Sequence, residues 1–102
     1  MEAPLEEIEF LARSTNRVEV LQLLASGPRT RRDLAAATGA SQATLGRILE
    51  DFAERSWVAR QGSEYVATAT GELVADGVEE LVSVLETEAK LRDVVAFLPT
   101  AE

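Results

Sequence analysis

The sequence of 102 residues contains no cysteine and no histidine, which removes most metal and redox chemistry. Without cysteine, the chain can form no disulfide bond and offers no thiol nucleophile. Without either residue type, zinc and most other transition metals lack their usual ligands. We therefore expect no metal site and no cofactor.

Patterns typical of enzymes and of membrane proteins are also missing. The sequence has no glycine-rich phosphate loop and no pair of acids placed to converge, in addition to lacking histidine and cysteine. It has no apolar run near the ~18 residues of a membrane-spanning helix, and no signal-peptide pattern. These absences predict a cytoplasmic protein that is not an enzyme and has no membrane partner.

Basic residues are scarce and unevenly placed. Ten basic residues stand against 18 acidic ones, for a net charge of -8, and Lys90 is the only lysine. Residues 13–60 hold eight arginines and five acids, whereas the rest of the chain holds two basic residues and thirteen acids. The middle of the chain is therefore mildly basic, which leaves room for a nucleic-acid contact there. Many acids with little lysine resemble the composition of proteins from salt-loving archaea.

Apolar periodicity and turn residues divide the chain into helices and one hairpin. Helices are expected at about 5–13, 16–26, 30–38, 41–55 and 70–98. Gly39 separates the third from the fourth, as in a helix-turn-helix unit. Thr30, Ser41 and Thr70 are the expected N-terminal caps, and Asp33 can complete a capping box with Thr30.

Two short strand-like runs, 57–60 and 65–67, follow the helix-turn-helix, with residues 61–64 as the turn between them. A hairpin in this position is a wing. The predicted fold is mainly α with a small β-hairpin, a winged helix-turn-helix plus a long C-terminal helix. The expected division is a DNA-binding domain over 1–69, a dimerisation helix over 70–98 and a tail over 99–102.

One segment carries a family resemblance. Residues 11–58 read LARSTNRVEVLQLLASGPRTRRDLAAATGASQATLGRILEDFAERSWV, with a Leu-Leu pair, a Gly-Pro turn, a Thr-Gly turn and Ser-Gln-Ala-Thr opening the fourth helix. This resembles winged helix-turn-helix transcription regulators of the arsenical-repressor-like families. With the acidic composition, it is closest in character to the N-terminal DNA-binding domain of haloarchaeal regulators. The resemblance implies a regulator that binds double-stranded DNA, and a C-terminal effector domain if the chain is a fragment. The metal ligands of the metal-sensing members have no counterpart here.

The recognition helix, about 41–55, is expected to enter the major groove with its first half. A helical-wheel projection places Leu45, Ile48, Leu49 and Phe52 on the side of this helix that faces the core. The candidate DNA contacts in this helix are Ser41, Gln42, Ala43, Thr44 and Arg47. Arg47 suits guanine and Gln42 suits adenine. The alternative for Arg47 is an ion pair with Glu50 or Asp51, whereas Asp51 is otherwise expected to pair with Arg55. Gly46 is predicted to let DNA approach the helix closely.

Further DNA contacts are expected outside the recognition helix. The phosphate-binding candidates are Arg29, Arg31 and Arg32, whose alternative role is a solvated face. The wing, about 57–68, offers Arg60, Gln61 and Ser63 to the backbone or minor groove. The two aromatic residues of this region, Trp57 and Tyr65, are expected in the core rather than stacked on bases.

The last helix carries more apolar surface than so small a domain needs. Its candidate dimerisation residues are Val74, Val78, Leu81, Val82 and Leu85, with spacing close to that of a coiled-coil seam. Together with the first helix they predict a homodimer. The alternatives are packing on an effector domain or on the chain's own core. A second function also stays open, because net acidity and a short wing suit a protein–protein interaction module without direct DNA binding.

Overall fold

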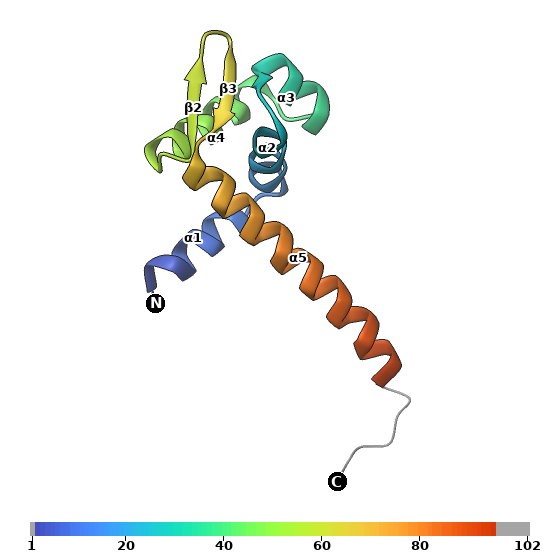
Figure 1. Ribbon diagram of the computed structural model, residues 1–102. Coiled ribbons are helices and arrows are strands. Elements are labelled where there is room, and N and C mark those ends of the chain that lie inside the picture. The colour runs from blue at the N-terminus through green and yellow to red at the C-terminus, as the bar shows by residue number, and fades with distance from the viewer. Residues whose placement is uncertain (1, 96–102) are drawn as a thin grey trace.

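The computed structural model describes residues 2–95, which form five helices and three strands (Figure 1). The elements in chain order are α1 (Glu2–Ala12), α2 (Thr15–Ser26), β1 (Arg29–Thr30), α3 (Arg31–Thr38), α4 (Gln42–Glu54), β2 (Val58–Gln61), β3 (Glu64–Ala67) and α5 (Ala69–Val95). The order is that of a winged helix-turn-helix with a long final helix, as predicted. The expected end of α5 at Leu98 and the tail 99–102 lie outside the described residues.

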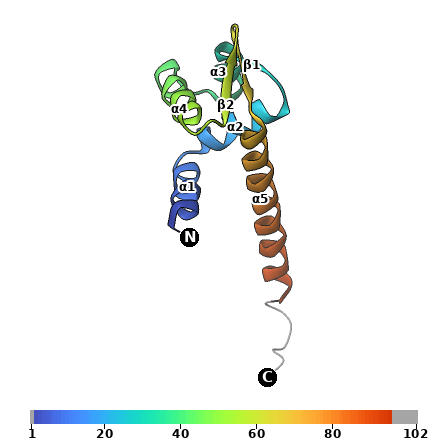
Figure 2. The same cartoon turned by 60° about the vertical axis from the view of Figure 1, so that its left-hand side comes forward.

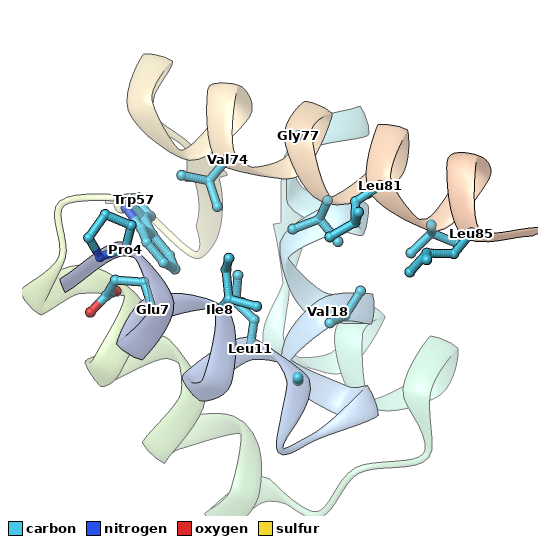
Figure 3. A pocket seen from close by; sticks show the side chains of 13 residues that line it. Pro4, Glu7, Ile8, Leu11, Val18, Trp57, Val74, Gly77, Leu81 and Leu85 are labelled. Atoms are coloured by element: carbon cyan, nitrogen blue, oxygen red, sulfur yellow. The ribbon is translucent and has the colours of Figure 1, made fainter. Parts of the chain in front are cut away.

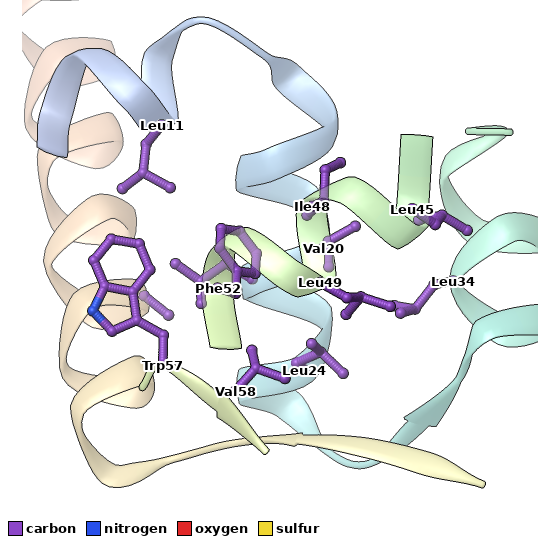
Figure 4. Packing of buried hydrophobic residues seen from close by; sticks show 12 residues of the cluster. Leu11, Val20, Leu24, Leu34, Leu45, Ile48, Leu49, Phe52, Trp57 and Val58 are labelled. Carbon is purple, nitrogen blue, oxygen red and sulfur yellow. The ribbon is translucent and has the colours of Figure 1, made fainter. Parts of the chain in front are cut away.

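The hydrophobic core joins the helix-turn-helix to α2 and to the start of the wing (Figure 4). Its buried members are Leu11, Val20, Leu21, Leu24, Leu34, Leu45, Ile48, Leu49, Phe52, Trp57, Val58 and Ala75. The four residues of α4 assigned to the core by the helical wheel are all buried. Burial of this stripe fixes which side of α4 faces outward, because the side chains opposite the stripe must point to solvent.

The wing is a three-stranded antiparallel sheet in the order β1-β3-β2, rather than the predicted two-stranded hairpin. Arg29 pairs with Tyr65 and Thr30 with Glu64, so the added strand is only two residues long. The turn is also shorter than predicted, because Gln61 and Glu64 are paired across the ladder. The two residues left are Gly62, at φ 64°, and Ser63. A positive φ at the first position of a two-residue turn matches the twist of the flanking strands.

Two helix boundaries differ from the predicted ones. Thr68, not Thr70, caps α5, because its Oγ1 accepts from the Gly71 backbone N–H at 3.1 Å. The Thr70 hydroxyl instead donates to the Ser56 carbonyl at 3.0 Å. At the other end of the chain α1 already begins at Glu2, and Pro4 lies in its first turn, where a missing N–H costs no intrahelical bond.

Helix α1 is fastened to the end of α4 by Arg55. The Nε of Arg55 donates to Glu7 Oε2 at 2.6 Å, and its guanidinium lies 3.7 Å from the centre of the Phe10 ring. Arg17 also lies over Phe10, at 4.2 Å, and donates to its carbonyl. The predicted pairing of the Asp51 and Arg55 side chains is wrong, since Arg55 bonds only the Asp51 carbonyl. Pairing with Glu7 is favoured over pairing with the Asp51 carboxylate, because it also lets Arg55 stack on the Phe10 ring.

Candidate nucleic-acid interface

Helix α3 begins with a complete capping box. The Thr30 N–H donates to Asp33 Oδ2 at 3.0 Å, and the Asp33 N–H donates to Thr30 Oγ1 at 3.1 Å. Hydrogen bonding by Thr30, first of all from its backbone N–H, holds the pKa of the Asp33 carboxyl below its usual range, and the positive charges of Arg29 and Arg32 add to the effect. The start of α3 is therefore fixed in position by local bonds.

The turn between α3 and α4 depends on Gly39, which has φ 74° in the left-handed region. Its N–H donates to the Ala35 carbonyl at 2.8 Å and ends α3. The Thr38 hydroxyl donates to the Leu34 carbonyl and accepts from the Ala40 N–H. With its polar groups paired in this way, the turn sets the angle between the two helices.

The candidate DNA-contacting residues in the first turn of α4 differ in whether they are hydrogen-bonded within the helix. Ser41 caps the helix, because its Oγ accepts from the Thr44 N–H at 3.1 Å and donates to Thr44 Oγ1 at 2.9 Å. Gln42 and Ala43 are exposed. Ser41 and Thr44 are thus tied to each other, whereas Gln42 and Ala43 face outward without such a bond.

Arg47 is exposed one turn further along α4. Within residues 2–95 it makes no hydrogen bond or ion pair, so neither Glu50 nor Asp51 holds its side chain. Its five N–H donors are available to a ligand. The structure therefore contains the exposed arginine on which the predicted guanine contact depends.

The three arginines before and within α3 lie in different surroundings. Arg29 is half-buried and donates to the Pro28 carbonyl and to Ser26 Oγ, each at 3.0 Å. Arg32 is exposed, with no hydrogen bond inside the described part of the chain. The guanidinium of Arg31 lies against Gly46 of α4. An arginine side chain therefore lies over Gly46, the position at which the sequence predicted a close approach of DNA.

The wing lies at the same end of the molecule as α3 and α4, while α5 runs away from it (Figures 1 and 2). Gln61 and Ser63 are exposed, but the Nε of Arg60 donates to the Gly62 carbonyl and its guanidinium lies 5.6 Å from the Tyr65 ring centre. Trp57 is buried as predicted, whereas Tyr65 is only partly buried at the edge of the core.

An open apolar groove of about 580 Å³ separates α1 from α5 (Figure 3). All five candidate dimerisation residues of α5 line it: Val74, Val78, Leu81, Val82 and Leu85. Ile8 and Leu11 face them from α1, and Trp57 closes one end. Leu81 and Leu85 remain 48% and 54% exposed, so residues 2–95 leave the groove unfilled. The first helix was expected to share this surface with the last one, but its individual residues were not assigned to it, because only the fold shows which of them lie opposite α5.

Two findings limit other kinds of site. Among residues 2–95 there is no group of three or more histidine, cysteine or acidic residues that could hold a metal ion. No helix in the same range is long and apolar enough to cross a membrane.

Several solved structures share this fold. Quinone-bound YodB from B. subtilis has a TM-score of 0.74 at 19% identity, over 83% of this chain and 98% of that one. The transcriptional repressor BigR from Xylella fastidiosa has a TM-score of 0.62 at 21% identity, over 84% and 93%. The N,N-8-amino-8-demethyl-D-riboflavin dimethyltransferase RosA from Streptomyces davawensis has a TM-score of 0.54 at 29% identity, over 71% of this chain but 22% of its own.

Sequence comparison then identifies the family. No functionally curated protein matches the chain significantly. Residues 5–90, however, match the model of the family described as HVO_A0261 N-terminal domain. The match covers the whole helix-turn-helix, the whole wing and most of α5, and it confirms the predicted resemblance to haloarchaeal winged-helix regulators. The chain is therefore a member of the haloarchaeal HVO_A0261 N-terminal domain family.

Proposed function

We propose that the protein is a sequence-specific transcriptional regulator that binds double-stranded DNA as a homodimer in the cytoplasm. Helix α4 enters the major groove and the hairpin contacts the backbone or minor groove beside it. The observation that carries this proposal is the outward face of α4. It presents Gln42, Ala43 and Arg47, and Arg47 has no internal partner within residues 2–95.

The distribution of charge supports the same orientation. The exposed Arg31 lies against Gly46 of α4, Arg32 is exposed on the neighbouring helix α3, and Arg60 lies in the wing. The acids are concentrated outside residues 13–60, in α1 and along α5. Because phosphate repels carboxylate, the end with the helix-turn-helix and wing is the one that DNA can approach.

The groove between α1 and α5 supports the proposed homodimer. Apolar side chains line it, and Leu81 and Leu85 would lose their exposed surface when a second copy covers them. A twofold axis through α5 would present two recognition helices to half-sites about 34–36 Å apart. An effector domain packed on α5 is the alternative occupant.

A protein–protein interaction module is the second candidate function. It is favoured by the net charge of -8 and by the short wing, whose Arg60 already binds its own turn. The fold match to part of RosA concerns a protein named as a methyltransferase. We propose no catalytic activity for this chain, because the sequence lacks histidine, cysteine and a glycine-rich phosphate loop.

A salt titration of DNA binding separates the two functions. A duplex enriched from a random-sequence pool is titrated at several KCl concentrations, with circular dichroism showing that the protein stays folded. The logarithm of the affinity should fall linearly with the logarithm of the salt concentration, by about 0.9 per phosphate neutralised. Failure to enrich or bind any duplex while folded would favour the interaction module.

Arg47→Ala tests the recognition helix directly. Loss of a bidentate base contact should weaken binding to the enriched duplex by about 1–3 kcal/mol. Arg92→Ala is the matched control, because Arg92 is exposed on α5 and paired with Glu88. Equal affinities for Arg47→Ala and the wild type would contradict the assignment of α4.

A further inference from the structure

Gly46 lies in the middle of α4, where glycine is a poor helix former. The helix around it is otherwise well built, with a capped start and four buried apolar residues. Its neighbourhood supplies a reason for the glycine. A Cβ at this position would overlap the terminal nitrogen of Arg31 and lie 3.6 Å from its Cζ.

Arg31 is the first residue of α3, so its side chain reaches from the start of one helix onto the side of the next. The missing side chain of Gly46 forms a notch, and the guanidinium of Arg31 occupies it. Within residues 2–95 Arg31 has no hydrogen bond or ion pair. Its donors are thus free, while its guanidinium lies against α4 at Gly46.

We propose that Gly46 is a positioning residue that seats Arg31 on the recognition helix, where Arg31 contacts a DNA phosphate. The inference rests on the proposed function. Arg31 then adds a phosphate contact beside the base-reading side chains of α4, although it is itself a residue of α3. Phosphate contacts of this kind set the register of a recognition helix in the groove.

The charges along this flank of α4 support the role. Gln42, Gly46 and Glu50 follow one another at intervals of four residues and therefore share one side of the helix. Arg31 accordingly lies between a candidate base reader and an acid. Its positive charge at Gly46 offsets the repulsion that Glu50 would exert on the DNA backbone.

A double-mutant cycle with Gly46→Ala and Arg31→Ala tests the proposal on the intact chain. Arg31→Ala should weaken binding to the enriched duplex about tenfold and lower the salt slope by about one. Gly46→Ala should weaken binding to a similar degree by displacing the guanidinium, even though alanine favours the helix. The double variant should bind no worse than Arg31→Ala alone.

Two binding results would overturn the proposal. One is wild-type affinity in Gly46→Ala. The other is an equal loss from Gly46→Ala in the presence and absence of the Arg31 side chain, which would mean that DNA itself approaches Gly46.

Thermal unfolding tests the packing of the Arg31 guanidinium against Gly46 independently of DNA. Gly46→Ala should raise the melting temperature more in the Arg31→Ala background, where no side chain is displaced, than in the wild type. Equal increases in melting temperature in the two backgrounds would show that Arg31 does not pack against Gly46. If the wild type binds no duplex but the two increases in melting temperature differ, the packing of Arg31 against Gly46 is supported. The proposed function and the phosphate contact are then both overturned.

Discussion

The two ends of the molecule differ in how far they bury their apolar side chains. In α4, four of the thirteen residues are buried, and a capping serine closes the start of the helix. In α5, only Gly71 and Ala75 of 27 residues are buried, and every described residue after Val78 is exposed. The helix-turn-helix end is held by contacts within the chain, whereas the described residues leave the apolar surface of α5 exposed, as is typical of an interaction surface.

The variant Phe52→Ala should give the largest loss of stability and so test this contrast most strongly. Phe52 is fully buried and packs against Phe10 and Trp57, with ring centres 6.1 and 5.8 Å away. Removing it should lower the free energy of unfolding by about 3–5 kcal/mol, measured by denaturant titration. Leu73→Ala, in a residue 71% exposed, should change it by less than ~0.5 kcal/mol. Comparable losses in the two variants would show that the ends do not differ.

The next effect concerns the groove. Changing Leu81 and Leu85 together to glutamate should convert the proposed dimer into a monomer, because like charges would meet in an apolar interface. Sedimentation velocity measures the change. Glu86→Gln is the control, since Glu86 is on α5 but does not line the groove. A wild type that already sediments as a monomer would reject the second copy as the occupant.

The smallest effect should come from the capping box. The pKa of Asp33 is lowered in the folded state, so its carboxylate stabilises the fold fully above the unfolded pKa of about 3.9. This contribution is lost as the pH falls through the lower, folded pKa. The difference in melting temperature between wild type and Asp33→Asn should therefore shrink between pH 5 and pH 3. A difference that is independent of pH would mean that the charge of Asp33 adds nothing.

The parts of the fold that could be predicted depend on signals close together in sequence. Thr30 with Asp33, Gly39 and Ser41 are each recognisable within four residues, and the structure places all of them as expected. The apolar stripe of α4 was likewise readable, because helical periodicity is local.

What escaped prediction depends on distant residues. Strand β1 has only two residues, and its partner β3 lies more than thirty positions along the chain. Glu7 and Arg55 are 48 positions apart. The contact of Arg31 with Gly46 joins two different helices, so no local sequence pattern indicates it. For the candidate site, the exposed face of α4 was predictable, whereas the arginine lying on its flank was not.

The bond from Arg55 to α1 also has a mechanical consequence. Arg55 follows the last residue of α4, and α1 forms one wall of the groove opposite α5. Any displacement of α1 must either break the contacts of Arg55 with Glu7 and Phe10 or carry the end of α4 with it. The molecule thus has a direct linkage, one side chain long, between the surface where a second copy is proposed to dock and the helix proposed to read DNA.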